Sequence, residues 1–277
     1  ALDAIRNIDR TVLEYSPSQG YRSYREKLVG YYKKYDINLN ADDIIITTGG
    51  SEAVLFAFMS CLNPGDEIIV PEPAYANYMA FAISAGAVIR TVTTTIEEGF
   101  SLPKVEKFEE LINERTKAIL ICNPNNPTSS AILRSDMERL LTFCEQHDIF
   151  VMIDETYVEF APVIEDVTAV PFTKTFKNLM VLRGVSKFFA APGVRLGYGI
   201  TGNMPFLKAM KEKQIPWSLN SLGAFAGELM LKDEEYIRQT RRLILSEREK
   251  MYSALKEQPA YKTYKPYANF LLVKLLQ

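Results

Sequence analysis

Short apolar runs alternate along this chain with segments in which apolar residues recur at a helical period. The apolar runs are rich in Ile, Val and Leu, and glycine, proline, asparagine or aspartate stands at or close after their ends. Runs of this kind predict buried strands, here at residues 44–47, 67–70, 118–122, 150–153 and 179–182. The segments between them predict helices, one from about 53 to 62 and another through residue 145 that starts with a capping box at Ser135 and Glu138. This alternation indicates an α/β fold.

The C-terminal part of the chain has a different pattern. Residues 233–257 predict one long charged helix, and residues 269–275 predict a further strand after it. No internal repeat or low-complexity tract interrupts the pattern.

Composition narrows the class of protein. Of the 277 residues, 47% are hydrophobic and 24% are charged, which is typical of a soluble globular protein. The net charge of −2 gives no reason to expect a nucleic-acid or acidic-membrane partner. No apolar run reaches the roughly 18 residues that a membrane helix needs. Because the chain begins at Ala1 and not at methionine, the sequence leaves the position of the native N-terminus undetermined.

Cysteine and histidine usage points to the cytoplasm and away from a metal site. Cys61, Cys122 and Cys144 are odd in number and form no CxxC pair, so we expect buried, reduced thiols in a cytoplasmic protein. His147 is the single histidine, which argues against a histidine-rich metal site, and we predict no metal.

Chemistry-bearing residues follow three of the predicted strands. Asn126, Asp154 and Lys187 come just after the strands at 118–122, 150–153 and 179–182. Because ligands of open α/β sheets bind at the carboxyl ends of strands, we expect these side chains to share one site. Taken singly, each has a plain alternative: a turn asparagine, a helix-capping aspartate and a surface lysine.

Residues suited to an anion accompany this set. Gly50, Ser51 and Glu52 open a helix directly after a strand, so their backbone N–H groups can point at a phosphate. Ser186 adds a hydroxyl, and Arg195 adds a cation that can bind an anion through two hydrogen bonds. A tight turn and a surface ion pair are the alternatives for the glycine pair and for Arg195.

The motifs taken in order resemble the pyridoxal-phosphate (PLP) dependent aminotransferases of class I/II, the aspartate aminotransferase superfamily of fold type I. The resemblance rests on residues 123–128 (Asn-Pro-Asn-Asn-Pro-Thr), 153–157 (Ile-Asp-Glu-Thr-Tyr), 184–190 (Gly-Val-Ser-Lys-Phe-Phe-Ala) and 192–198 (Pro-Gly-Val-Arg-Leu-Gly-Tyr). It implies a three-layer α/β/α PLP-binding large domain with a mostly parallel mixed sheet over residues 1–245. Residues 246–277 would then be the end of a connecting helix and the truncated start of a small α+β domain.

The resemblance also implies roles. Lys187 would form a Schiff base with PLP and carry a proton during the reaction, and Asp154 would pair with the pyridine nitrogen. Asn126 and Tyr157 would bind the 3′-oxygen of the cofactor, and Tyr75 would stack on its ring. The phosphate would be bound by Gly50, Ser51, Glu52, Ser186, Arg195 and, from the partner subunit of a homodimer, Tyr15 within a dimer-contact segment at 1–20. The chain departs from the family pattern at Ser129, where glycine is usual.

The implied activity is transfer of an amino group between an amino acid and a 2-oxo acid by a ping-pong mechanism. Different motifs resemble the aspartate/aromatic branch and the histidinol-phosphate branch, so the substrate stays open. A C–S β-lyase or an amino-acid decarboxylase of the same fold is the alternative, and a PLP-sensing regulatory domain ranks lower. The substrate-carboxylate arginine of the family would lie beyond residue 277, so we expect this chain alone to bind PLP but to transaminate poorly.

Overall fold

A seven-stranded sheet forms the centre of the computed structural model, which describes residues 2–8 and 11–276. The strand order is β1-β7-β6-β5-β4-β2-β3, and β7 runs antiparallel to β1 and β6 while the other neighbours are parallel. The strands are β1 (Ile44–Thr47), β2 (Glu67–Glu72), β3 (Val88–Thr93), β4 (Thr116–Cys122), β5 (Phe150–Asp154), β6 (Leu179–Gly184) and β7 (Gly197–Ile200). The predicted mostly parallel mixed sheet is confirmed.

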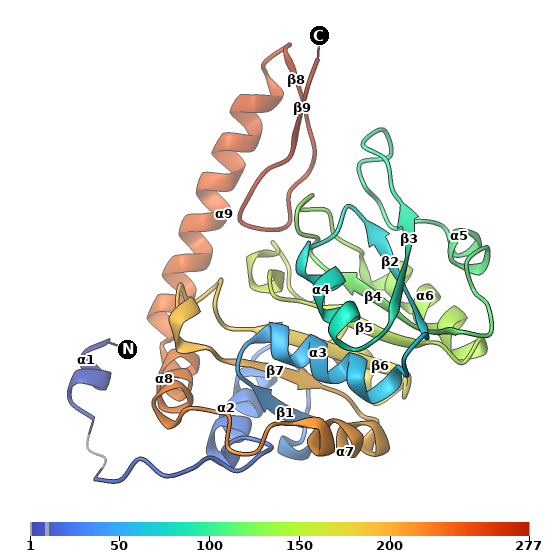
Figure 1. The fold of residues 1–277 in the computed structure, drawn as a ribbon. Helices are drawn as coiled ribbons and strands as arrows, with labels where there is room; N and C mark the ends of the chain where they lie inside the picture. Colours follow the sequence, from blue (N-terminus) through green and yellow to red (C-terminus); the bar gives the residue numbers. More distant parts are fainter. Residues whose placement is uncertain (1, 9–10, 277) are drawn as a thin grey trace.

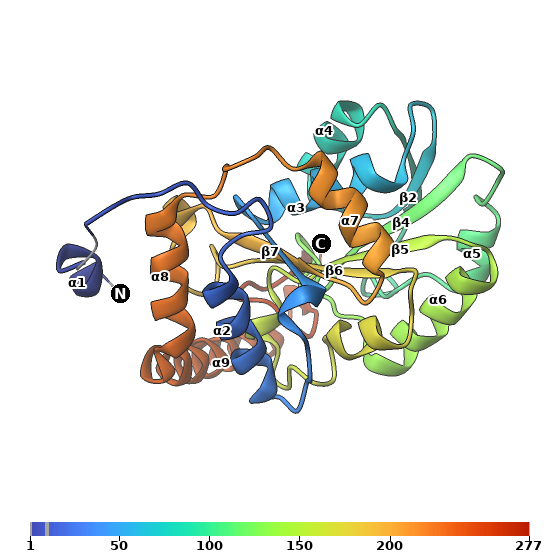
Figure 2. The ribbon, with the colours of Figure 1, turned by 90° about the horizontal axis from the view of Figure 1, so that it is seen from below.

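Helices cover both faces of this sheet and bury it. Alternate residues of a strand point to opposite faces, so Ile119 and Val151 pack into one core while Leu120 and Met152 pack into the other. The first core is closed by α2 (Arg22–Lys33), α5 (Val105–Glu109), α6 (Arg134–Gln146) and α8 (Ser221–Lys232). The second is closed by α3 (Gly50–Cys61), α4 (Asn77–Ser84) and α7 (Met204–Lys213), which gives three layers (Figure 2).

Two parts of the chain extend away from the three layers. Figure 1 shows α9 (Glu234–Lys256) rising from the sheet with β8 (Tyr261–Thr263) and β9 (Val273–Leu275) near its far end, and α1 (Leu2–Arg6) apart from the layers. The side chain of Asp233 caps α9 by accepting a hydrogen bond from the Tyr236 amide at 3.1 Å. Within α9 the buried residue is Arg248, whose guanidinium donates to the carbonyls of Phe160 and Ala268, each at 2.8 Å.

The free edge of β1 is covered by two glutamines. The Gln19 side chain donates to the Ile44 carbonyl at 3.0 Å, and the backbone carbonyl of Gln19 accepts from the Ile46 amide at 3.1 Å. The Gln214 side chain donates to the Ile46 carbonyl at 2.9 Å. These bonds replace the strand partner that an edge lacks.

Two local predictions differ from the structure. The capping box at Ser135 is wrong: α6 begins at Arg134 after Leu133, and no side chain caps it. The amides of Asp136 and Met137 already donate to the Leu133 carbonyl, at 3.1 and 3.0 Å, so the helix starts before Ser135. The strand predicted over 269–275 is limited to β9, because only residues 273–275 pair with β8.

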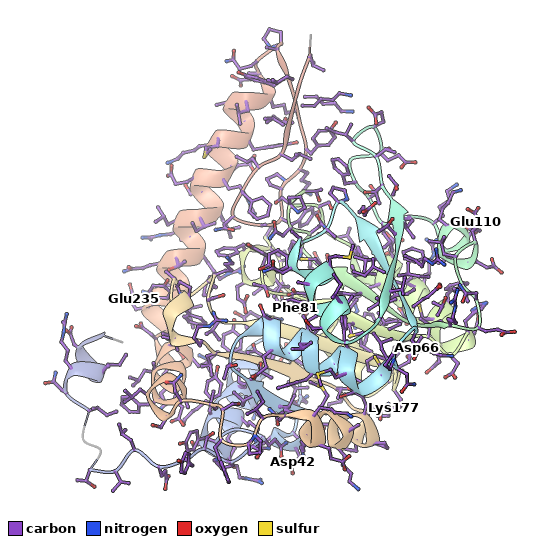
Figure 3. The ribbon with its side chains drawn as sticks, in the orientation of Figure 1. Asp42, Asp66, Phe81, Glu110, Lys177 and Glu235 are labelled. Carbon is purple, nitrogen blue, oxygen red and sulfur yellow. The ribbon has the colours of Figure 1, made fainter. Side chains whose placement is uncertain are left out.

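Charged side chains lie around the periphery of the molecule, as Asp42, Asp66, Glu110, Lys177 and Glu235 illustrate in Figure 3. Phe81 from α4 lies toward the middle of the same view, where it lines the cavity described below. None of the helices within 2–8 and 11–276 is both long and apolar enough to cross a membrane. Cys122 and Cys144 are buried and Cys61 is half-buried, and all three are unpaired.

Candidate active site

A cavity of about 350 Å³ lies at the carboxyl ends of β4, β5 and β6, beside the N-terminus of α3. It brings together nearly all of the residues that the sequence predicts for a site. Those that line it are Gly50, Ser51, Tyr75, Asn126, Asp154, Tyr157, Ser186, Lys187 and Arg195. Their roles stay predictions, but their shared location agrees with the expectation drawn from the strand ends.

The carboxylate of Asp154 ends β5 and is held by donors on both oxygens. Oδ1 accepts from the amide and the hydroxyl of Thr156, at 3.0 and 2.6 Å. Oδ2 accepts from the hydroxyl of Tyr78 at 2.8 Å. These bonds fix the plane of an anionic group that opens into the cavity.

Lys187 follows β6 in a turn that its apolar neighbours anchor. Phe188 is 2% exposed, its ring packs edge-on against Phe160, and its carbonyl accepts from the Tyr236 hydroxyl at 3.0 Å. Lys187 itself is exposed to the cavity, with Nζ 6.0 Å from the centroid of the Tyr157 ring. The turn therefore presents a primary amine while its flanks stay in the core.

The N-terminus of α3 and the Arg195 guanidinium approach each other closely. Gly49, the residue before α3, has φ 107°, and a Cβ there would lie 2.7 Å from Nη2 of Arg195. That guanidinium donates to the carbonyls of Thr48 and Pro192, at 3.3 and 3.1 Å. A Cβ on Gly197 would lie 2.3 Å from the Gly49 carbonyl carbon, so two backbone segments meet here without side chains between them. The result is a compact pocket of N–H groups and positive charge.

Two asparagines that precede Asn126 hold its loop. The Asn123 side chain donates to the carbonyls of Ile132 and Val167, at 3.1 and 3.0 Å. The Asn125 side chain donates to the Pro73 carbonyl at 3.2 Å and accepts from the amide and hydroxyl of Thr128. This bracing leaves Asn126 at the cavity wall.

The two aromatic candidates are also fixed by neighbours. Tyr157 is 8% exposed and meets the Phe270 ring edge-on, and burial raises the pKa of its hydroxyl. Tyr75 lies edge-on to Tyr78, with ring centroids 5.5 Å apart, and its hydroxyl accepts from the Asn77 side chain.

Ser129, which replaces the usual glycine, has a left-handed backbone with φ 63°. Its buried hydroxyl accepts from the amides of Tyr267 and Ala268, at 3.1 and 2.8 Å. The substitution thus ties the Asn126 loop to the segment that follows α9.

Two predicted residues do not line the cavity. The Glu52 carboxylate accepts a hydrogen bond from the Thr48 amide at 2.7 Å, so its side chain stabilises the turn before α3. Tyr15 is 79% exposed and packs on Trp217, with ring centroids 5.3 Å apart. Its predicted role depends on a second subunit.

Sequence reasoning missed Tyr78, Thr156 and Cys122, which also line the cavity. The only signal was position in the sequence: Thr156 follows Asp154 by two residues, and Tyr78 follows Tyr75 by three. Nothing in the pattern indicates that the Tyr78 hydroxyl reaches Asp154.

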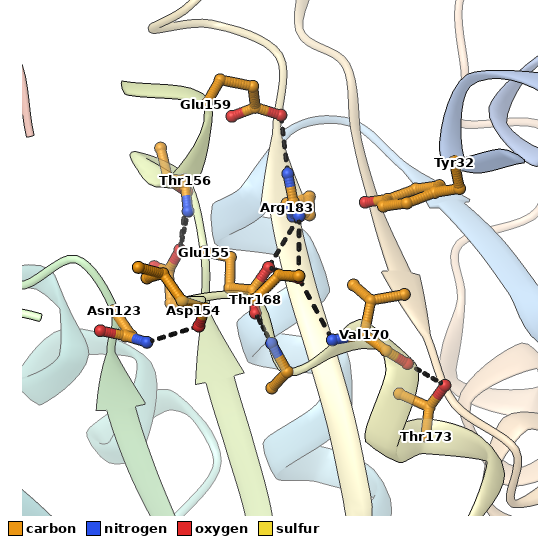
Figure 4. Close-up of polar contacts among 12 residues, drawn as sticks. Tyr32, Asn123, Asp154, Glu155, Thr156, Glu159, Thr168, Val170, Thr173 and Arg183 are labelled. Atoms are coloured by element: carbon orange, nitrogen blue, oxygen red, sulfur yellow. Dashed lines mark hydrogen bonds and ion pairs between the residues drawn. The ribbon is translucent and has the colours of Figure 1, made fainter. Parts of the chain in front are cut away.

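A buried ion cluster lies beneath the site (Figure 4). Arg183 on β6 pairs with Glu155 and Glu159, with nitrogen–oxygen distances of 2.7 Å to each, and all three side chains are buried. Glu155 also accepts from the Thr168 hydroxyl and the Ala169 amide. Because Glu155 follows Asp154 and Arg183 precedes the Lys187 turn, the cluster joins the two strand ends that carry the central residues.

Comparison with known proteins agrees with this geometry. The family model for aminotransferase class I and II matches residues 1–277. The chain is 33% identical over 242 residues to histidinol-phosphate aminotransferase of Ruminiclostridium cellulolyticum, covering 86% of this chain and 64% of that protein. It is 31% identical over 275 residues to a putative threonine-phosphate decarboxylase of Caldanaerobacter subterraneus subsp. tengcongensis, covering 99% of this chain and 71% of that protein.

Among solved structures, a double mutant of Thermus thermophilus aspartate aminotransferase superposes with a TM-score of 0.86. The sequence identity is 27%, over 98% of this chain and 72% of that one. An alanine aminotransferase from Pyrococcus furiosus gives a TM-score of 0.84 at 28% identity, over 99% of this chain and 71% of that one. The sequence, the sheet order and the cavity at its strand ends agree with these matches: the chain belongs to the aminotransferase class I and II family.

Proposed function

We propose that this chain is the PLP-binding part of an aminotransferase that moves an amino group between an amino acid and a 2-oxo acid. One observation carries the proposal: an amine, a held carboxylate and an anion pocket, from Lys187, Asp154 and the Gly49–Arg195 region, open into the same cavity. The chain spans 64% of the length of the histidinol-phosphate aminotransferase relative, so the activity of the whole protein is part of the proposal.

The residues present fit PLP by the chemistry of their donor set. The cofactor has an aldehyde, a ring nitrogen, a ring hydroxyl oxygen and a phosphate, which need an amine, a carboxylate, neutral donors and a cationic pocket. Lys187, Asp154, Asn126 with Tyr157, and Arg195 with Ser51 and Ser186 supply these groups around one space. The backbones of Gly49 and Gly197 approach so closely that a Cβ on Gly197 would overlap the Gly49 carbonyl, and this contact sets the position of the α3 N-terminus beside Arg195.

We assign the parts as follows. Lys187 would hold the aldehyde carbon covalently, and Asp154 would hold a proton on the ring nitrogen. Tyr75 would cover the ring face. The amides of Gly50 and Ser51 would bind the phosphate at the start of α3, and the Glu52 amide is part of the same predicted set.

When bound, PLP supplies an electron sink for a bond broken at the substrate Cα. Lys187 would then act as the acid and base, because its amine stands on a turn facing the cavity. Asp154 acts through its charge, which Thr156 and Tyr78 orient by hydrogen bonds. Arg195 would neutralise the phosphate and so help to hold the cofactor beside Lys187.

The reaction has a specific alternative. A putative threonine-phosphate decarboxylase is similar over 99% of this chain, so decarboxylation on the same residues is the second candidate. Histidinol phosphate and aspartate are the substrates that the named relatives suggest for transamination, and the resemblance of the sequence motifs to the aspartate/aromatic branch adds aromatic amino acids. A C–S β-lyase is a further variant, and a PLP-sensing regulatory domain ranks below all of these.

The proposal includes a homodimer and two domains. The exposed apolar side chains of Val12, Leu13, Tyr15 and Trp217 support a dimer-contact segment near the N-terminus, with Tyr15 reaching the phosphate of a partner. The separate β8–β9 sheet supports a large domain over 1–245 and the start of a small domain over 246–277. Unpaired cysteines support a cytoplasmic location.

The test is an absorbance spectrum of the protein with PLP, before and after borohydride. We expect a band at about 410–430 nm whose reduction leaves the cofactor on the Lys187 peptide, identified by mass spectrometry. Lys187→Ala should abolish this band, whereas Lys208→Ala, at an exposed position of α7, should keep it. Trapping on another lysine, or on none, contradicts the proposal.

The product identifies the reaction. Amino acids added singly to the full-length protein should give a 2-oxo acid and require a second oxo acid for turnover. Carbon dioxide as the product would favour the decarboxylase, and pyruvate with ammonia would favour the β-lyase.

A further inference from the structure

Tyr78 connects α4 to the carboxylate at the centre of the site. Its side chain is 2% exposed, and its hydroxyl donates to Oδ2 of Asp154 at 2.8 Å. Thr156 occupies the other oxygen with two bonds of its own. Among the described residues, Tyr78 is thus the side chain that donates a hydrogen bond to Oδ2.

The direction of this bond follows from its surroundings. Burial and the negative charge of Asp154 raise the pKa of Tyr78 well above its usual value, so the phenol keeps its proton and donates. Tyr75 lies edge-on to Tyr78, and Cys122 is a further titratable neighbour. Burial raises the pKa of the Cys122 thiol as well, which leaves it neutral. A charge-assisted hydrogen bond from the Tyr78 phenol stabilises the ionised form of the Asp154 carboxyl group.

We infer that Tyr78 is a positioning residue that, through Asp154, controls how firmly a proton is held on the ring nitrogen of the bound cofactor. The inference rests on the proposed function. A carboxylate and a ring nitrogen can share one proton in two ways: as a charged pair with the proton on nitrogen, or as a neutral pair with the proton on oxygen. The Tyr78 bond stabilises the carboxylate and so favours the charged pair.

A purely structural role for Tyr78 has a matched counterpart in the same chain. Tyr24 on α2 is a fully buried tyrosine whose hydroxyl has no hydrogen-bond partner in the described structure, and it packs in the opposite core. Removing either hydroxyl deletes one buried oxygen, but only the Tyr78 hydroxyl contacts Asp154. Tyr24→Phe therefore controls for packing.

The experiment uses PLP labelled with ¹⁵N at the ring nitrogen, bound to the wild type, Tyr78→Phe and Tyr24→Phe. We expect the nitrogen resonance of Tyr78→Phe to move toward that of an unprotonated pyridine, while Tyr24→Phe keeps the wild-type position. In the full-length enzyme, kcat of Tyr78→Phe should fall about tenfold with KM within about twofold, since the lost bond is to a charged group. Thr156→Val, which removes a donor from Oδ1, should move the resonance the same way and serves if Tyr78→Phe does not fold.

The possible outcomes distinguish failure of this inference from failure of the proposed function. A borohydride-stable linkage at Lys187 with an unmoved resonance in the folded variants overturns the inference alone. Equal shifts in Tyr78→Phe and Tyr24→Phe also overturn it, because packing would then explain both. Absence of the linkage in the wild type overturns the proposed function and this inference with it.

Discussion

Replacing Arg183 with methionine tests the buried ion cluster directly. The substitution keeps the volume of a long side chain but removes the charge that pairs with Glu155 and Glu159 at 2.7 Å each. Glu155 is 0% exposed and would retain only the Thr168 hydroxyl and the Ala169 amide as donors. Removing one partner of a buried ion pair costs about 3–5 kcal/mol, so we expect a loss of stability in that range.

The loss should depend on pH in a defined direction. Burial raises the pKa of Glu155, and the charge of Arg183 opposes that rise. Without Arg183 the folded-state pKa rises further above the unfolded value. A carboxylate with a raised folded pKa stabilises the folded state at low pH and loses this contribution as pH rises through the folded value. The difference between Arg183→Met and wild type should therefore be larger at pH 7.5 than at pH 5.

Urea denaturation at both pH values measures this, with Arg139→Met as a matched control. Arg139 pairs with Asp136 at 3.1 Å on the surface of α6, where the two side chains are 69% and 52% exposed. A surface pair of this kind contributes about 0–1 kcal/mol. If Arg183→Met costs no more than Arg139→Met, or costs the same at both pH values, the account of the cluster is wrong.

Three other perturbations have equally defined results. Arg90, Asn113 and Arg115 lower the pKa of Glu67 to about 2. Thermal melts should therefore show Glu67→Gln to be less stable than wild type at pH 7, with the difference in stability closing as pH falls from about 4 toward 2. A difference in stability that does not change with pH refutes this. Gly197→Ala places a Cβ against the Gly49 backbone and should weaken PLP binding at least tenfold, measured by absorbance titration. Gly193→Ala, which meets nothing within 4 Å, should not, and equal effects would show that the close approach of Gly49 and Gly197 does not shape the binding site. Ser129→Gly and Ser129→Ala both remove the hydroxyl that binds the amides of Tyr267 and Ala268, so both should speed amide hydrogen exchange at Ala268. Ser129→Ala should be less stable than Ser129→Gly, because alanine is strained in the left-handed backbone conformation of this position and glycine is not. Unchanged exchange at Ala268 would show that the hydroxyl bond does not hold this segment.

The sequence predicts the part of the site that follows from strand ends. Asn126, Asp154 and Lys187 were placed together because a polar residue after a buried run lies at a known edge of a parallel sheet, and the cavity lies there. The same reasoning located β1, β4, β5 and β6 within two residues.

Contacts between distant segments were not predictable in this way. The bond from Tyr78 to Asp154 joins residues 76 positions apart, and it depends on how α4 packs over the sheet. The capping box at Ser135 failed for a related reason, because the Arg134 amide donates to the Asp166 carbonyl at 2.9 Å and a tertiary contact fixes the approach to the helix. Local pattern reports which residues are buried or polar, but not which of them meet.

The pairing of β1 with β7 has a consequence for synthesis. Ile44 pairs with Ile200, so β1 leaves the ribosome long before its neighbour in the sheet exists. At typical translation rates the roughly 150 residues between them take about 8–30 s to make. During that time four consecutive buried residues, Ile44 to Thr47, have no strand partner, and Gln214, which covers part of their outer edge, is also still to be made. The nascent chain therefore exposes an apolar, unpaired strand segment for seconds, and we expect chaperones to bind the nascent chain mainly at that segment.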